Sequence, residues 1–170
     1  MMNIAVVGAG YVGLITGIGF AKLNHQVSII DLNNDLINNL NNSKAPFYEP
    51  ELEENLNDLD LRNKLNFSTS YEESIDKKTD VVFVCVQTPT DIDTGKTNTD
   101  YINSVLIKLK ELENLNFTVC IKSTINSNLV QNISKNIGLN FERIIFNPEL
   151  LREGSAFYDF FNPDRIIIGG

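Results

Sequence analysis

The sequence predicts an α/β fold of the Rossmann type, a doubly wound and mostly parallel sheet with helices on both faces. Short apolar runs alternate with helical patterns along the chain, as in repeated strand and helix units. The runs at 3–7, 81–86 and 117–122 are hydrophobic almost throughout, which is typical of central parallel strands buried on both faces. A glycine-rich segment directly after the first run marks a strand-to-helix turn.

Seven short runs are the predicted strands, and helical patterns lie in several of the gaps between them. The strands are expected at residues 3–7, 27–30, 65–68, 81–86, 117–122, 144–146 and 165–168. The helical patterns cover residues 11–23, which are small and apolar all round, the more polar 35–42, then 51–59 and 100–112. In the last two patterns the apolar side chains recur at helical spacing, which predicts one buried face each.

The first turn has the pattern G-x-G-x-x-G at Gly8, Gly10 and Gly13. A helix that begins there points unpaired N–H groups and its positive dipole end at an incoming pyrophosphate. Gly8 would permit the tight turn, Gly10 the close approach of a phosphate, and Gly13 the close packing of helix on strand. A tight turn without a ligand is the alternative, but the flanking strand and helix favour a dinucleotide site.

Asp31 ends the second predicted strand, at the place where a dinucleotide-binding fold carries an acid about 20 residues beyond the glycines. A carboxylate there can accept hydrogen bonds from both hydroxyls of the adenosine ribose and repels a 2′-phosphate. The predicted cofactor is therefore NAD rather than NADP. Asp31 could also cap the helix that follows, and the two roles are compatible.

Composition excludes several other classes of protein. The 170 residues fit one domain, and the net charge of −8 argues against long-range attraction to nucleic acid or an anionic membrane. No secretion signal or membrane-length apolar run is present, and Cys85 and Cys120 lie in apolar runs as reduced core thiols would. We therefore expect a cytoplasmic protein with no metal site, in which His25 is a turn residue far from the cofactor.

Three further motifs follow predicted strands, and so lie at the same edge of the sheet as the glycine loop. They are Thr88-Pro89-Thr90, Lys122-Ser123-Thr124 and the stretch 147–156. Together with Tyr48-Glu49-Pro50 and the glycine loop, in this order and at this spacing, they make the chain resemble the UDP-glucose/GDP-mannose dehydrogenase family from residue 2 to residue 170. The stretch 147–156 is the most specific of the five.

The resemblance implies an activity. Such enzymes oxidise the C6 alcohol of a sugar nucleotide to a carboxylate in two NAD-dependent steps. The segment Arg152-Glu153-Gly154-Ser155-Ala156 favours UDP-glucose, with UDP-glucuronate as product; GDP-mannose and UDP-N-acetylmannosamine are the alternatives, and a non-catalytic NAD-binding module is a third.

The resemblance also implies what this chain lacks. A cysteine in the C-terminal half of such enzymes captures the aldehyde, with lysine and asparagine partners in the middle of the chain, and none of those segments falls within residues 1–170. We expect these residues to be the NAD-binding domain of a longer enzyme, inactive alone and homodimeric at full length.

Matching position by position gives each motif a role that the resemblance implies. Thr124 would contact the nicotinamide end of the cofactor and hold a water or the reacting oxygen, Glu153 would be its acid or base, and Glu149 would support water or substrate placement. The sugar-nucleotide site would be lined by Leu150, Leu151 and Arg152, and further cofactor contacts would come from Tyr11, Val12 and Thr88.

Two features of these motifs leave room for other interpretations. Taken without the resemblance, Glu149 could cap a helix and Glu153 could pair with Arg152. The family usually has Pro-x-Gly after its Ser-Thr motif, whereas this chain has Asn126-Ser127-Asn128. Asparagine tolerates a left-handed turn, which could preserve the loop.

Overall fold

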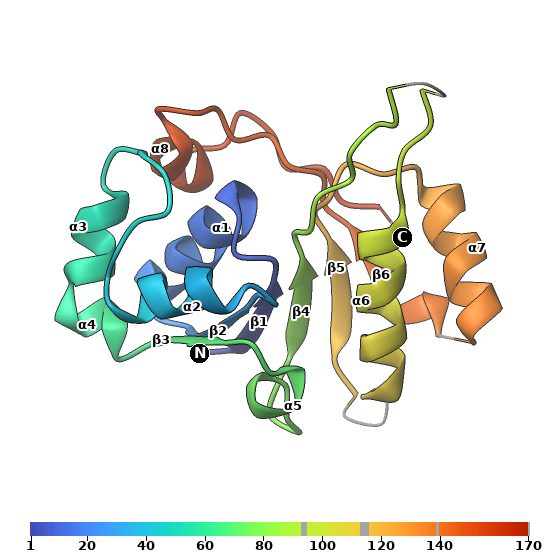
Figure 1. Cartoon of the computed structure of the whole chain (residues 1–170), viewed down its shortest axis with the longest axis horizontal. Coiled ribbons are helices and arrows are strands. Elements are labelled where there is room, and N and C mark those ends of the chain that lie inside the picture. The colour runs from blue at the N-terminus through green and yellow to red at the C-terminus, as the bar shows by residue number, and fades with distance from the viewer. Residues whose placement is uncertain (93–94, 113–115, 139, 170) are drawn as a thin grey trace.

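The six strands of the computed structural model form one parallel sheet, in the residues that it describes, 1–92, 95–112, 116–138 and 140–169. Their order is β3-β2-β1-β4-β5-β6 (Figure 1). The strands are β1 (Asn3–Val7), β2 (Gln26–Ile30), β3 (Leu65–Ser68), β4 (Val81–Val84), β5 (Thr118–Ile121) and β6 (Ile144–Phe146). The order reverses between β1 and β4, which is the doubly wound Rossmann arrangement that the sequence predicts.

Helices cover both faces of this sheet. They are α1 (Tyr11–Lys22), α2 (Asn34–Asn41), α3 (Leu52–Asn57), α4 (Leu59–Arg62), α5 (Tyr71–Ser74), α6 (Asp100–Glu111), α7 (Ser127–Ile137) and α8 (Ala156–Phe161), with a short 3-10 helix at Phe141–Arg143 before β6. One buried cluster joins the sheet to α1, α2, α3, α4 and α8, and the other joins it to α5, α6 and α7.

The side chains of β1 divide between these two clusters. Successive strand residues point to opposite faces, so Ile4 and Val6 pack with α1 while Ala5 and Val7 pack with α6. Four apolar residues of α6 are buried at the predicted helical spacing: Ile102, Val105, Leu106 and Leu109. The near-continuous hydrophobic runs are therefore strands covered on both sides.

The predicted strand 165–168 is wrong. The segment forms no ladder: an isolated antiparallel bridge joins Phe146 to Gly169, and the Asn147 side chain donates to the carbonyl of Ile167. Ile166 and Ile168 are each 68 % exposed. A run of β-branched residues favours a strand only where a neighbouring strand and a packing surface exist, and β6 is three residues long.

Two helix predictions also need correction, and both errors lie in capping. The predicted helix 51–59 is interrupted at Asp58, whose side chain accepts hydrogen bonds from the N–H groups of Asp60 and Leu61 and so begins α4. The cap of α2 is Asn33, which accepts from Leu36, and not Asp31. Side chains that bind nearby backbone N–H groups start new helices.

The predictions for the cysteines and the histidine are confirmed. Cys85 and Cys120 are free and buried, and burial raises the pKa of the Cys120 thiol to about 11 and that of Cys85 further still. His25 follows α1, and its Nδ1 accepts a hydrogen bond from the Met2 N–H (3.0 Å) at the amino edge of the sheet. Among the described helices, none has the length and apolar character needed to cross a membrane.

Gly13 should be essential for stability, and Gly10 should not. A Cβ at Gly13 would lie 1.7 Å from the carbonyl oxygen of Gly8, whereas one at Gly10 meets nothing within 4 Å. We expect Gly13→Ala to lower the free energy of unfolding by about 3 kcal/mol or more, and Gly10→Ala by about 1 kcal/mol or less. Urea unfolding of both variants measures this, and equal losses would show that α1 does not depend on the close contact.

Candidate functional site

The glycine loop connects β1 to α1 at the carboxyl edge of the sheet. Gly8 has a φ of +100°, its N–H donates to the carbonyl of Ile30 (2.8 Å), and a Cβ there would meet the carbonyl oxygen of Cys85 at 2.8 Å. Gly10 is the cap residue of α1, and no side chain of the described residues caps that end. An open space in front of Gly10, beside an uncapped helix start, is the geometry that accepts a phosphate.

Asp31 lies at the end of β2 and touches this loop. Its Oδ2 accepts a hydrogen bond from the N–H of Ala9 (2.9 Å), and its Oδ1 accepts one from Asn33 (2.9 Å). The side chain thus holds the glycine loop to β2. A carboxylate has about four acceptor positions, so both oxygens can still bind the hydroxyls of a ribose.

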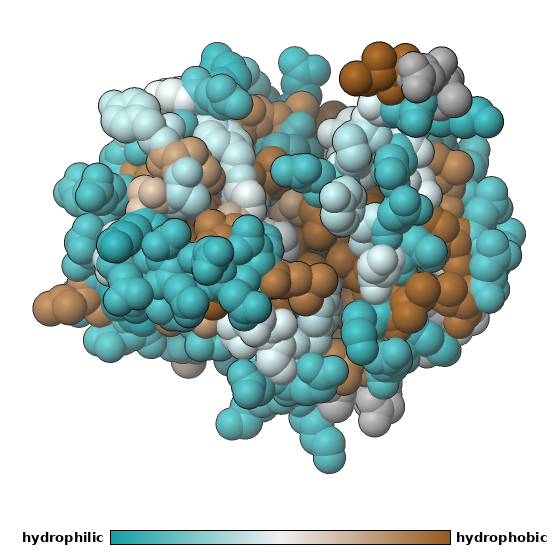
Figure 2. Space-filling view, in the orientation of Figure 1, coloured by the Kyte–Doolittle hydropathy of each residue, from teal (hydrophilic) through white to brown (hydrophobic). Residues whose placement is uncertain are grey.

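The surface around the reversal in strand order is hollowed. Figure 2 shows hydrophilic side chains over α2 and hydrophobic ones in the hollow between α2 and α6. Strands β1 and β4 are paired neighbours, and the helices that follow them, α1 and α6, pack on opposite faces of the sheet. Their carboxyl ends therefore border the crevice in which doubly wound folds bind ligands.

The two threonine motifs meet at this edge. The Thr88 hydroxyl donates to the carbonyl of Thr124 (2.9 Å), and Ser123 donates to the carbonyl of Val86 (2.6 Å). The loop that follows Thr124 does not use a left-handed asparagine, because Asn126 has a φ of −69° and caps α7 by accepting from Asn128. The departure from Pro-x-Gly is therefore accommodated by an ordinary helix cap.

Glu149 has two kinds of partner. Its Oε1 accepts hydrogen bonds from the N–H groups of Leu150 and Leu151 (2.6 Å each). Both N–H groups belong to the loop before α8, whose cap residue is Ser155, so the helix-capping interpretation of Glu149 is wrong. Its Oε2 lies 3.3 Å from the ammonium of Lys122, and both side chains are largely buried. Lys122 also donates to Asn147 (3.2 Å). The buried Oε2 accepts no hydrogen bond from the described residues, so it can accept one from a water or a ligand.

Arg152 does not pair with Glu153. Its guanidinium donates two hydrogen bonds to the Asp159 carboxylate (3.0 and 2.5 Å), and the backbone N–H of Arg152 donates a third to the same carboxylate (3.0 Å). These donors hold the pKa of the Asp159 carboxyl far below its usual range. Glu153 itself is exposed, as is Leu150, while Leu151 is half-buried.

Glu49 is the residue that sequence reasoning missed. It is 5 % exposed, and it accepts hydrogen bonds from the Tyr11 hydroxyl (3.0 Å), the Gly154 N–H (2.8 Å) and the Ala156 N–H (2.9 Å). Burial and the Glu49 carboxylate raise the pKa of the Tyr11 hydroxyl well above its usual value. The motif Tyr48-Glu49-Pro50 includes this residue, but no local sequence pattern predicts its hydrogen bonds to residues more than 100 positions away.

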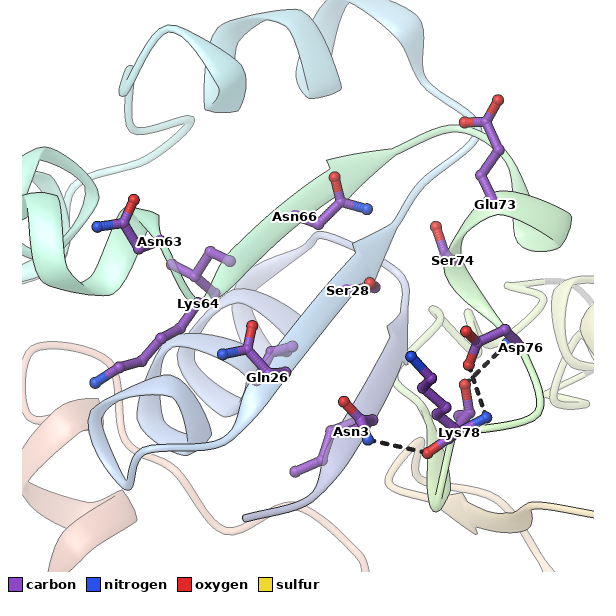
Figure 3. Close-up of a pocket in the computed structure, with 14 residues that line it drawn as sticks. Asn3, Gln26, Ser28, Asn63, Lys64, Asn66, Glu73, Ser74, Asp76 and Lys78 are labelled. Carbon is purple, nitrogen blue, oxygen red and sulfur yellow. Dashed lines mark hydrogen bonds between the residues drawn. The ribbon is translucent and has the colours of Figure 1, made fainter.

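Two cavities flank the sheet. One of about 500 Å³ is lined by Lys122 and Asn147, by residues 148–152 and by residues 163–167, which includes most of the predicted substrate motif. The other, of about 230 Å³, lies at the amino ends of β1, β2 and β3 among polar side chains such as Asn3, Gln26 and Asn66 (Figure 3). That edge is opposite the glycine loop. Within the described residues, no group of His, Cys, Asp and Glu could hold a metal ion.

Comparison with known proteins identifies the family. The model of the UDP-glucose/GDP-mannose dehydrogenase family, NAD binding domain, matches residues 2–170. The chain belongs to this family. UDP-glucose 6-dehydrogenase YwqF from Bacillus subtilis is 35 % identical over 99 % of the chain and 39 % of its own length. The chain thus spans about two-fifths of the length of the curated relatives that it matches.

Solved structures of nucleotide-sugar dehydrogenases share the fold. That of UDP-glucose dehydrogenase from Pyrobaculum islandicum is 33 % identical with a TM-score of 0.87, covering 99 % of this chain and 40 % of that one. GDP-mannose dehydrogenase from Pseudomonas aeruginosa is 28 % identical with a TM-score of 0.88, covering 99 % and 41 %. The cofactor of this domain is NAD, and the open space at Gly10 beside Asp31 fits it.

Asp31 should decide between NADH and NADPH. We expect the chain to bind NADH more tightly, and Asp31→Ala to weaken NADH binding about tenfold or more, since hydrogen bonds to a charged group are lost. NADPH binding should weaken less, because repulsion of its 2′-phosphate disappears with the carboxylate. Calorimetry with both cofactors measures the ratio. As a control, Asp35→Ala removes the same charge from the exposed first turn of α2 and should leave the ratio of NADH to NADPH affinity unchanged. An unchanged ratio in Asp31→Ala would contradict the assignment of Asp31 to the ribose site.

Proposed function

We propose that residues 1–170 are the NAD-binding domain of a UDP-glucose 6-dehydrogenase, which oxidises UDP-glucose to UDP-glucuronate with two NAD. The observation that carries the proposal is the placement of residues 152–154 beside the start of α1, through the contacts of Glu49 and Tyr11. This placement brings the most family-specific motif to the cofactor loop. The identity of 35 to 37 % to relatives named UDP-glucose 6-dehydrogenase supports the choice of sugar nucleotide.

The glycine loop and Asp31 would hold the cofactor, which supplies a hydride acceptor when bound. Gly8, Gly10 and Gly13 would let the pyrophosphate approach the start of α1, and Tyr11, Val12 and Thr88 would make further contacts with the cofactor. The one O–H proton of Tyr11 is shared between Glu49 and the carbonyl of Arg152, so the contribution of Tyr11 to the cofactor would come from its backbone or ring.

The chemistry assigned to the other residues is proton transfer and positioning. Thr124 would hold a water or the reacting oxygen near the nicotinamide end, and exposed Glu153 would accept the proton of the C6 alcohol. The free lone pairs of Glu149 Oε2 would orient a water or a substrate hydroxyl, beside the ammonium of Lys122. Leu150, Leu151 and Arg152 would line the sugar-nucleotide site, in the cavity of about 500 Å³.

GDP-mannose is the second candidate substrate, with UDP-N-acetylmannosamine beside it. GDP-mannose dehydrogenase has a TM-score of 0.88 to this chain, and a UDP-D-ManNAc dehydrogenase from Pyrococcus horikoshii has one of 0.85. The domain fold is thus compatible with each sugar nucleotide. The whole enzyme would be a cytoplasmic homodimer, and UDP-glucuronate would serve polysaccharide biosynthesis. Assaying the whole enzyme with all three sugar nucleotides separates the candidates.

Catalysis should need both the missing half and Glu153. The chain alone holds two cysteines, both buried with raised pKa values, so it offers no activated thiol to hold an aldehyde. We expect no UDP-glucuronate from residues 1–170. With the native C-terminal half restored, two NADH should form per UDP-glucose, and Glu153→Gln should slow turnover about 100-fold or more through loss of the proton acceptor.

The matched control for this prediction is Glu142→Gln, at an exposed residue of the 3-10 helix before β6, which should turn over normally. Sustained NADH production by the 170-residue chain with UDP-glucose would contradict the division of labour between the halves. Normal turnover of Glu153→Gln would move the role of base to another residue.

A further inference from the structure

The backbone on both sides of Glu153 is fastened to the start of α1. Before it, the carbonyl of Arg152 accepts a hydrogen bond from the Tyr11 hydroxyl (3.1 Å). After it, the N–H of Gly154 donates to Glu49 Oε2 (2.8 Å). The same Tyr11 proton is shared with Glu49 Oε2 (3.0 Å), because a phenol has a single O–H. The exposed carboxylate of Glu153 therefore projects from a backbone that has little freedom of its own.

Glu49 holds this arrangement together. The carboxylate is buried, and the described residues give it hydrogen-bond donors but no cation. Its second oxygen accepts from Ala156 (2.9 Å), the first residue of α8, whose own cap residue Ser155 donates to Asp159 instead. Hydrogen bonds from N–H and O–H groups to a buried carboxylate are stronger than neutral ones.

The turn after Glu153 depends on Gly154. Its φ is +87°, in the left-handed region that only glycine adopts freely, and this conformation accompanies the hydrogen bond from its N–H to Glu49. The clamp formed by Glu49 and Tyr11 thus joins three parts of the chain: the loop before α3, the residue directly after Gly10, and the segment 152–156.

We propose that Glu49 is a positioning residue for Glu153. Through Tyr11 and Gly154 it fixes the peptide groups that flank Glu153, and so holds the Glu153 carboxylate near the nicotinamide end of a dinucleotide seated on the glycine loop. The inference rests on the function proposed above. It assigns to Glu49 no contact with cofactor or substrate.

The oxidised and reduced cofactors provide a readout of that position. The nicotinamide ring carries a positive charge in NAD⁺ and none in NADH, so a fixed carboxylate nearby favours NAD⁺ by Coulomb attraction. At a separation of about 8 Å in a partly hydrated site the preference is roughly fivefold. A loosened Glu153 samples more distant positions, and the preference falls. ADP-ribose has no nicotinamide, so its affinity should not respond.

The experiment is calorimetry of NAD⁺, NADH and ADP-ribose with the parent chain, Glu49→Gln, Glu153→Gln and the double variant. Glutamine keeps the size of Glu49 but places an NH2 group against at least one N–H or O–H donor. We expect Glu153→Gln to lower the ratio of NAD⁺ to NADH affinity roughly fivefold and Glu49→Gln to lower it by a smaller factor, because the loosened Glu153 keeps its charge. The double variant should lower the ratio no further than Glu153→Gln alone. Glu53→Gln removes the same charge from the exposed face of α3 and should keep the parental ratio.

A parental ratio in Glu49→Gln would overturn the inference, as would an equal loss of affinity for all three ligands.

Amide hydrogen exchange tests the clamp without any ligand: exchange at Gly154 and Ala156 should accelerate at least tenfold in folded Glu49→Gln, and parental rates would refute the clamp. If Glu49→Gln does not fold, Tyr11→Phe removes a single donor and should give a smaller change in the same direction. A parent chain that binds none of the three ligands would instead refute the proposed function, while the exchange rates still report on the clamp.

Discussion

The contact between Gly13 and the carbonyl of Gly8 sets the geometry on which the rest of the site depends. No side chain fits between them, since a Cβ at Gly13 would lie 1.7 Å from that oxygen. Helix α1 can therefore pack directly against the end of β1, with its uncapped start facing the carboxyl edge of the sheet. Every other loop of the site is placed relative to this helix start.

Carboxylates bound to backbone N–H groups then assemble the edge. Asp31 holds Ala9 of the glycine loop, Glu49 holds Gly154 and Ala156, and Glu149 holds Leu150 and Leu151. The chain has a net charge of −8, and several of its carboxylates thus bind backbone N–H groups near the place where an anionic cofactor binds. The pyrophosphate would be met by a helix start and backbone groups rather than by a cluster of cations.

Local patterns were enough to predict the fold and the position of the glycine loop and Asp31 at the carboxyl edge of the sheet. Strand runs, the glycine spacing and the acid after β2 are short-range features with a direct physical meaning. The features that were not predicted depend on contacts between distant parts of the chain or on the presence of a neighbouring element. The three isoleucines at 166–168 resemble a strand but lack a partner ladder, and Asp58 and Asn33 place helix caps that periodicity does not reveal. Glu49 could not be assigned because its donors lie 38 and more than 100 residues away.

NAD is expected to bind at the carboxyl edge, on the glycine loop and Asp31. Nuclear magnetic resonance of the labelled chain, titrated with NADH, tests this binding site most directly. We expect the largest amide shift changes at residues 9–13 and 31–33, smaller ones at Thr88 and Thr124, and none around Asn66 and Ser74 in the polar cavity of the opposite edge (Figure 3). Shift changes confined to that opposite cavity, or none at residues 9–13 under saturating NADH, would contradict it.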